Sequence, residues 1–329
     1  MSQYDFWRQK YLVKHAAQKV IGAAPGLYRL QERFKQLTGR WQQPASPQWI
    51  EQHARDTVDH LVQAQIAPPN YVVEQGTGWH GLDAVIFYLS GSERIDTYDV
   101  RPWLREQLVR GVCRCVELIA PIVASWPGVD VTLLDERVRR AREAARLPLR
   151  ELLESMNIRY CVTSTMQRGD VPSGSADLFY SNSVLQRFEA GELTDLLAES
   201  RRFLAPDGSS FHRIDCKDFH SITDPRIPEL YYLSFSDATW RLLTSKYLNG
   251  QNRLRLPHFL QMFDAAGFAA ETPWHVLTQE NLSYVRASLA DHVELGEMDA
   301  EAAAISRFDI LASPREAACI TGERRARCA

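Results

Sequence analysis

Residues 71–100 read YVVEQGTGWHGLDAVIFYLSGSERIDTYDV, and this stretch decides the fold. It begins with an apolar segment of strand length at 71–75, passes through a glycine-rich turn into an apolar helix at 81–90, and ends with a second strand at 95–99. A strand, a tight turn, a helix and a second strand in this order are typical of parallel α/β sheets, which bind ligands beyond the carboxyl ends of their strands. The stretch therefore predicts an α/β fold with a ligand site at the glycine turn.

The turn contains Gly76, Gly78 and Gly81 in the spacing G-x-G-x-x-G. Alone, this spacing is a weak signal, because glycines at such turns also allow close packing. Asp99 ends the second strand 21 residues after Gly78, where a carboxylate can accept two hydrogen bonds from a ribose diol. The alternative for Asp99 is a helix N-cap ahead of Pro102. Together the glycines and the acid predict a site for an adenosine-containing ligand.

Glu74 indicates which ligand this is. A strand buried on both faces is expected to be apolar, and a charge at its carboxyl end is costly unless it is paired. S-adenosylmethionine (SAM) carries an ammonium and a sulfonium group that an acid would attract, whereas the pyrophosphate of a dinucleotide would be repelled. The alternative is an exposed acid paired with a nearby arginine. We therefore predict SAM, as methyl donor or as substrate, and keep an NAD(P) oxidoreductase as a weaker alternative.

The rest of the chain continues the alternation of strands and helices. It predicts a mainly parallel sheet with helices on both faces, that is, a Rossmann-like domain. We find no internal repeat. Helices are expected at 101–120, at 134–155 with an interruption at Pro148, at 192–204 and up to Gly267, and strands at 158–163, 177–182, 210–216, 269–276 and 307–314.

The first 69 residues form a separate region of amphipathic helices, broken by prolines. Residues 1–40 carry eight basic and two acidic residues, which gives this segment a formal charge of +6 and leaves −9 for the remainder. We interpret residues 1–69 as a helical lid over a catalytic domain at 70–329; contact with a membrane surface is the alternative. The lid would bring aromatic side chains over the ligand, namely Tyr4, Phe6, Trp7 or Tyr11.

Four residues near the ends of the later strands are candidates for catalysis. Tyr180 and Asn182 end the predicted strand at 177–182, and His212 and Asp215 lie in the strand at 210–216, with Asp218 and His220 just beyond it. Transfer to a hydroxyl or amine requires a base within hydrogen-bond reach, a role open to the histidine or to Asp215. Single residues of these types on strands are more often structural, but their clustering favours a site here.

These motifs, in this order, resemble the class I SAM-dependent methyltransferase family. The resemblance spans about residues 70–275 and the last strand, and includes ADLFYSNSVLQRF at 176–188 and LAESRRFLAPDGSSFHRID at 197–215. One departure is Asp207-Gly208, where the family usually has Gly-Gly. The resemblance implies that Gly76 and Gly78 face the methionine part of SAM, that Glu74 lies near its amino group and that Asp99 binds the ribose. It also implies that residues 163–167 border the adenine.

Several functions remain open on this basis. The first is transfer of the SAM methyl group to a small-molecule acceptor. The second, weighted almost equally, is intramolecular cyclisation of SAM to azetidine-2-carboxylate with release of 5′-methylthioadenosine. It is included because the long lid also resembles the azetidine-2-carboxylate synthases of this fold. A non-catalytic protein that keeps the fold is a further alternative, which the intact set of Glu74, Gly76, Gly78 and Asp99 does not favour.

Composition narrows the partners. A net charge of −3 gives no general attraction to nucleic acid, and the arginines of 137–150 are interspersed with acids, as on a solvated helix face. The six cysteines form no CxxC pair, so we expect no metal site and a reducing, cytoplasmic location. No apolar run reaches the ~20 residues of a membrane span, and no secretory signal is recognisable. We expect a small-molecule substrate; the oligomeric state stays open.

Overall fold

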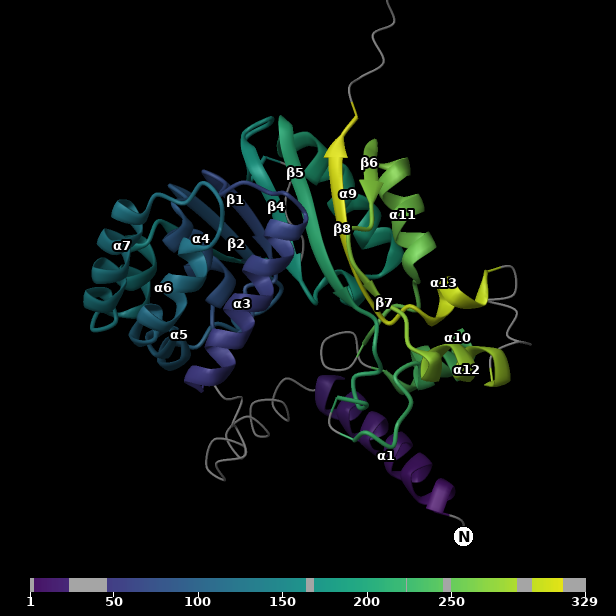
Figure 1. The fold of residues 1–329 in the computed structure, drawn as a ribbon. Coiled ribbons are helices and arrows are strands. Elements are labelled where there is room, and N and C mark those ends of the chain that lie inside the picture. Colours follow the sequence, from purple (N-terminus) through teal and green to yellow (C-terminus); the bar gives the residue numbers. More distant parts are fainter. Residues whose placement is uncertain are drawn as a thin grey trace, which may run out of the picture.

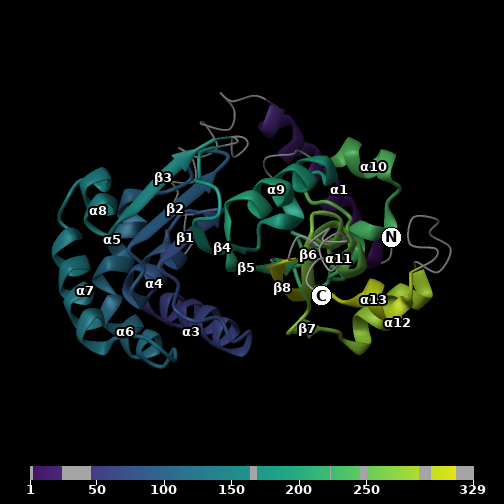
Figure 2. The ribbon, with the colours of Figure 1, turned by 90° about the horizontal axis from the view of Figure 1, so that it is seen from above.

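The structure is a computed structural model that describes residues 3–23, 46–163, 169–222, 224–244, 250–288 and 298–315, with side chains at 10–21 and in the later ranges. Its centre is one sheet with the strand order β3-β2-β1-β4-β5-β8-β6, and β7 also pairs with β8 (Figures 1 and 2). The pairs among β1 to β5 are parallel, whereas β8 runs antiparallel to β5, β6 and β7. The strands are β1 Tyr71–Gln75, β2 Arg94–Asp99, β3 Ile158–Val162, β4 Ala176–Asn182, β5 Leu204–Asp215, β6 Phe268–Glu271, β7 His275–Val276 and β8 Arg307–Pro314.

Helices cover both faces of this sheet (Figures 1 and 2). Helices α3 to α8 pack on one face around Val72 and Tyr180, and α9 and α11 pack on the other around Val73 and Phe179. The predicted class, α/β with a mainly parallel sheet between helices, is therefore confirmed. The helices are α1 Gln3–Ala23, α3 Pro47–Gln63, α4 Leu82–Ser90, α5 Glu106–Arg114, α6 Val116–Ala124, α7 Val131–Ala144, α8 Leu149–Ser155, α9 Ala190–Phe203, α10 Asp237–Leu243, α11 Leu256–Ala265, α12 Gln279–Ser288 and α13 Ala300–Ala304, with short 3₁₀ turns η1 Leu185–Arg187 and η2 Tyr231–Ser234.

Most predicted elements lie where the sequence signals put them. The strand predicted at 307–314 is β8, Pro148 separates α7 from α8, and Gly267, with φ +86°, follows the end of α11. The single helix predicted at 101–120 is wrong, because α5 begins only at Glu106 and the chain breaks again at Cys115 before α6. The strand predicted at 269–276 is two strands, β6 and β7, since the residues around Pro273 do not join the ladder.

The two described N-terminal helices have different surroundings. Four apolar side chains of α3, from Ile50 to Leu61, are fully buried in the same core as β1. In contrast, α1 lies beyond the carboxyl ends of the parallel strands, close to α10 (Figure 1). There the Tyr11 hydroxyl donates a hydrogen bond to Asp218 Oδ2 at 2.6 Å. The boundary at residue 69 between a lid and a catalytic domain stays a prediction. None of the described helices is long and apolar enough to cross a membrane.

Candidate active site

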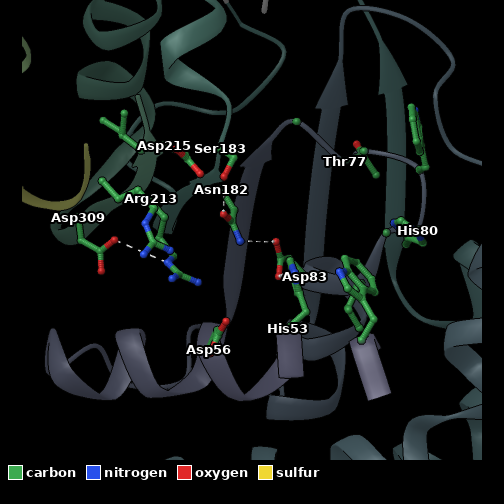
Figure 3. A pocket seen from close by; sticks show the side chains of 18 of the residues that line it. His53, Asp56, Thr77, His80, Asp83, Asn182, Ser183, Arg213, Asp215 and Asp309 are labelled. Atoms are coloured by element: carbon green, nitrogen blue, oxygen red, sulfur yellow. Dashed lines mark hydrogen bonds and ion pairs between the residues drawn. The ribbon is translucent and has the colours of Figure 1, made fainter. Parts of the chain in front are cut away.

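The glycine turn between β1 and α4 borders a cavity of about 530 Å³ at the carboxyl ends of the strands (Figure 3). Gly76 and Gly78 have φ values of +92° and +65°, a backbone conformation that favours glycine. They differ in their surroundings. A Cβ at Gly76 would lie 2.2 Å from Val184 Cγ2, whereas a Cβ at Gly78 would meet no atom within 4 Å. Gly76 therefore allows close packing, and Gly78 leaves open space for a ligand.

The cavity wall combines four parts of the chain: the glycine turn, one face of α3, the ends of β4 and β5, and the segment from Trp274 to β8. It contains both acidic and basic side chains. The lining residues are Trp49, His53, Asp56, Gly76, Thr77, Gly78, Trp79, His80, Gly81, Leu82, Asp83, Asn182, Ser183, Arg213, Ile214, Asp215, Ile222, Trp274, Arg307 and Asp309.

Helix α3 supplies a polar stripe beside its apolar face. Trp49, His53 and Asp56 follow one another at spacings of four and three residues, so they share one side of the helix and line the cavity. One turn further, His60 Nδ1 contacts Asp309 Oδ2 on β8. Sequence reasoning missed these residues because it assigned α3 to a lid. The signal was present, since polar residues at helical spacing flank the apolar stripe of the same helix.

Asp83, in the first turn of α4, links three elements of the wall. His53 Nε2 lies 2.8 Å from Asp83 Oδ1, and the Thr57 hydroxyl donates to the same oxygen at 3.0 Å. Asn182 Nδ2, at the end of β4, donates to Asp83 Oδ2 at 3.5 Å (Figure 3). Burial alone would raise the pKa of Asp83, but His53 and the hydrogen bonds lower it below its usual value. Burial alone would lower the pKa of His53, and Asp83 raises it instead.

Glu74 is buried at the end of β1, with 2% of its surface exposed, and is not part of the cavity wall. The Thr97 hydroxyl donates to Glu74 Oε2 at 2.5 Å. Among the described residues no lysine or arginine forms an ion pair with it, so the arginine-paired alternative is not supported. Burial, with the nearby charge of Asp83, raises the pKa of Glu74 to about 8. A cation close to this carboxyl would reverse that shift.

Asp99 ends β2 next to the glycine turn. Its Oδ2 accepts a hydrogen bond from the Gly78 backbone N–H at 3.1 Å, and its side chain also bonds to the backbone of the two residues that follow it. Burial raises the pKa of Asp99 to about 6. The alternative that Asp99 is a helix N-cap is wrong, because α5 begins only at Glu106 and its N-cap residue is Arg105. The carboxylate instead bonds to the backbone of the loop that follows β2 and lies against the glycine turn. Its binding to a ribose stays a prediction.

The four catalytic candidates do not come together. Asn182 and Asp215 line the cavity, and burial raises the pKa of Asp215. Tyr180 is fully buried in the core with its ring against Phe87, at a centroid distance of 5.0 Å. Tyr180 therefore has no face on the cavity wall.

His212 lies on the opposite face of the sheet from the cavity. Its ring nitrogens are 2.7 Å from the Ser181 hydroxyl and 2.6 Å from the Ser210 hydroxyl, and its ring packs against Phe179. Burial lowers the pKa of His212 to about 3. Side chains alternate along a strand, so Arg213 rather than His212 faces the cavity. This geometry gives His212 a packing role.

Part of the predicted site lies outside the described residues. This holds for 164–167 of the predicted adenine loop and for the side chains of Tyr4, Phe6 and Trp7. Tyr11 is described, and its ring contacts Tyr231 and His220 rather than the cavity wall.

Comparisons with known proteins give structural neighbours only. No protein-family model matches the sequence, and no curated protein gives a significant match. The YcgJ protein from Bacillus subtilis is 14% identical over 81% of this chain and 100% of its own, with a TM-score of 0.39. A SAM-dependent methyltransferase from Mesorhizobium loti is 15% identical over 74% of this chain and 90% of its own, with a TM-score of 0.38. Geranyl diphosphate C-methyltransferase from Streptomyces coelicolor is 16% identical over 80% of this chain and 78% of its own, with a TM-score of 0.40. The fold assignment rests on the strand order and directions of the chain itself.

Proposed function

We propose that this protein is a SAM-dependent transferase that moves a methyl group to a small-molecule acceptor. The observation that carries the proposal is the arrangement of buried carboxyl groups around an open glycine turn. Glu74, Asp83 and Asp99 are each at most 9% exposed, and all three lie within one β–α–β unit. Of these three, Asp83 has a cationic partner among the described residues, His53.

These three carboxyl groups suit a ligand that carries a positive charge and a ribose. Burial raises the pKa of Glu74 to about 8 and that of Asp99 to about 6, which means that burial disfavours the ionised form of both carboxyl groups. A cationic or hydrogen-bond-donating ligand would stabilise the ionised form. The open side of Gly78 gives a ligand access to the backbone of the turn. The buried carboxyl groups beside the glycine turn would repel an anionic pyrophosphate, which argues against NAD(P).

When bound, SAM supplies an electrophilic methyl group that needs no further activation. The residues of the wall would then position the reactants and exclude water. Asn182, held by Asp83 at the end of β4, presents its amide to the cavity. Asp215, whose pKa is raised by burial, is the proposed acceptor of the proton that leaves the nucleophile.

Cyclisation of SAM requires its α-amine to be neutral. Acidic groups near an amine favour the ammonium form, so Glu74 and Asp83 favour methyl transfer over cyclisation. Incubation of the pure protein with SAM alone, followed by mass spectrometry, separates the two reactions. We expect SAM to remain intact; catalytic formation of methylthioadenosine and azetidine-2-carboxylate would establish cyclisation instead.

Binding of SAM itself is tested by calorimetry on Asp99→Ala and the wild-type chain. We expect the variant to lose most of its affinity for SAM and for S-adenosylhomocysteine, with its circular dichroism spectrum unchanged. Failure of the folded wild-type protein to bind either compound would refute the proposed function.

A further inference from the structure

A second cavity, of about 660 Å³, lies beside the chain that follows β4. It is formed by η1 and the start of α9, by η2 and α10, and by residues 250–254. None of its lining residues belongs to the glycine-turn cavity. They are Arg187, Phe188, Glu189, Ala190, Leu233, Asp237, Trp240, Arg241, Thr244, Gly250, Gln251, Asn252, Arg253 and Leu254.

Arg187 is a largely buried cationic side chain in the wall of this cavity. Its Nη1 donates to the Gly250 carbonyl oxygen at 3.1 Å, and its guanidinium lies over the Phe219 ring at 5.4 Å. No carboxylate of the described residues forms an ion pair with it, although burial lowers its pKa. Arg253, in the same wall, is already neutralised, because its Nη1 lies 2.8 Å from Asp237 Oδ1. A partly desolvated guanidinium that forms no ion pair, with only the charge of Asp215 acting on it from beyond ion-pair distance, attracts an anion.

Two further groups favour a polar ligand with an apolar part. Gln251 is 6% exposed, and its Nε2 finds no acceptor among the residues that the structure describes. The Trp240 ring is held in place by a hydrogen bond from its Nε1 to the Gln251 carbonyl oxygen at 2.8 Å. The cavity thus offers an unused amide beside a fixed aromatic ring, next to the apolar side chains of Phe188, Leu233 and Leu254.

We propose that this second cavity binds a small molecule carrying a phosphate or carboxylate group, with Arg187 as its anion-binding residue, and that this molecule is the methyl acceptor. The identification as acceptor rests on the proposed function; the binding of an anion does not. The two cavities are connected through the end of the sheet, because η1, which carries Arg187, follows β4 directly and packs against β5, and the ends of both strands line the first cavity. An acceptor anchored at Arg187 would therefore have its other end directed toward the ends of β4 and β5.

The test measures binding of phenyl phosphate, benzoate and uncharged phenol to the full chain saturated with S-adenosylhomocysteine, by calorimetry or ligand-observed NMR. We expect at least one anion to bind and phenol to bind much more weakly. Arg187→Met should lower the affinity for the anion by about tenfold or more, and Arg187→Lys should lower it less. Comparison of the two anions decides whether phosphate or carboxylate is preferred.

The matched control is Arg241→Met, which removes an exposed arginine from the same wall. It should change the affinity for the anion by no more than about twofold, because exposed charges interact weakly. Equal binding of the anions by the wild-type protein and Arg187→Met, or no binding of either anion, would overturn the inference. Affinity for S-adenosylhomocysteine is measured separately on each variant, so that a failure of the proposed function is distinguished from a failure of the second cavity.

Discussion

His53 Nε2 and Asp83 Oδ1, 2.8 Å apart, join α3 to the first turn of α4 across the wall of the glycine-turn cavity. Their side chains are 25% and 11% exposed, so the pair is largely removed from solvent. Each partner shifts the other toward its charged form, since Asp83 raises the pKa of His53 and His53 lowers the pKa of Asp83. The other carboxylate oxygen of Asp83 accepts from Asn182, so the ion pair also orients a residue at the end of β4.

Asp83→Asn should destabilise the fold in a pH-dependent way. The stability that His53 contributes to the fold is fully present below its unfolded pKa of about 6.5 and is lost as pH rises through its raised folded pKa. The contribution of Asp83 is present above its unfolded pKa of about 4 and is lost as pH falls through its lowered folded pKa. The loss of stability in Asp83→Asn, about 1–3 kcal/mol, should therefore be largest between about pH 4 and 6.5 and smaller at pH 9.

Thermal melting across pH 4–9 checks this window. Asp56→Asn is the matched control, because Asp56 lines the same cavity from α3 but is exposed. It should alter stability by less than about 0.5 kcal/mol at every pH. An equal loss of stability in Asp83→Asn at pH 5 and pH 9 would contradict a charged pair.

Binding of SAM should release a proton from Glu74 near neutral pH. Burial keeps the pKa of Glu74 at about 8, so the carboxyl is mostly protonated at pH 7, and a cationic ligand would lower that pKa and expel the proton. Calorimetry in two buffers with different heats of ionisation measures the release directly. Glu74→Gln should bind SAM more weakly and should release fewer protons. Identical binding heats in the two buffers for the wild-type protein would refute this role of Glu74.

Alanine substitutions at the two glycines of the turn should have different effects, one mainly on stability and the other mainly on binding of SAM. Gly76→Ala should cost about 2–4 kcal/mol of stability, because its Cβ would overlap Val184 in addition to the strain of the positive φ. Gly78→Ala should cost only about 1–2 kcal/mol, which is the strain alone, but should weaken binding of SAM by occupying the open side of the turn. Denaturant unfolding and calorimetry give the two quantities for each variant.

Val184→Ala serves as the control for this pair. Combined with Gly76→Ala it should restore part of the lost stability, since the smaller side chain removes the overlap at 2.2 Å. Full additivity of the two substitutions would show that the contact with Val184 does not explain the conformation of the turn.

The sequence predicted the sheet and the glycine turn because these features are local. The strands β1, β2, β3 and β8 each have a short apolar or alternating pattern bounded by turn residues, and their positions were predicted to within a residue at each end. The second cavity and the pair of His53 and Asp83 depend on contacts between segments 30 or more residues apart, which no local pattern records. The place of His212, a candidate base in the sequence analysis, could not be predicted for a related reason. Its position in a strand was predicted, but which face of the sheet it occupies depends on the pairing with β4 and β8.

His212 and Asp215 should therefore have separable effects. His212→Asn should lower stability, because it leaves a smaller side chain between two buried hydroxyl groups, and SAM affinity should stay within about twofold. Since burial lowers the pKa of His212 to about 3, the wild-type protein loses stability as pH falls from about 6.5 toward 3, and the variant should lose less over that range. Asp215→Asn should leave the melting temperature and SAM affinity nearly unchanged and should reduce turnover once an acceptor is supplied. Melting curves at pH 4, 5.5 and 7, combined with SAM titrations, test the first variant without knowledge of the acceptor. A tenfold loss of SAM affinity in His212→Asn at unchanged stability would place this histidine in the binding site after all.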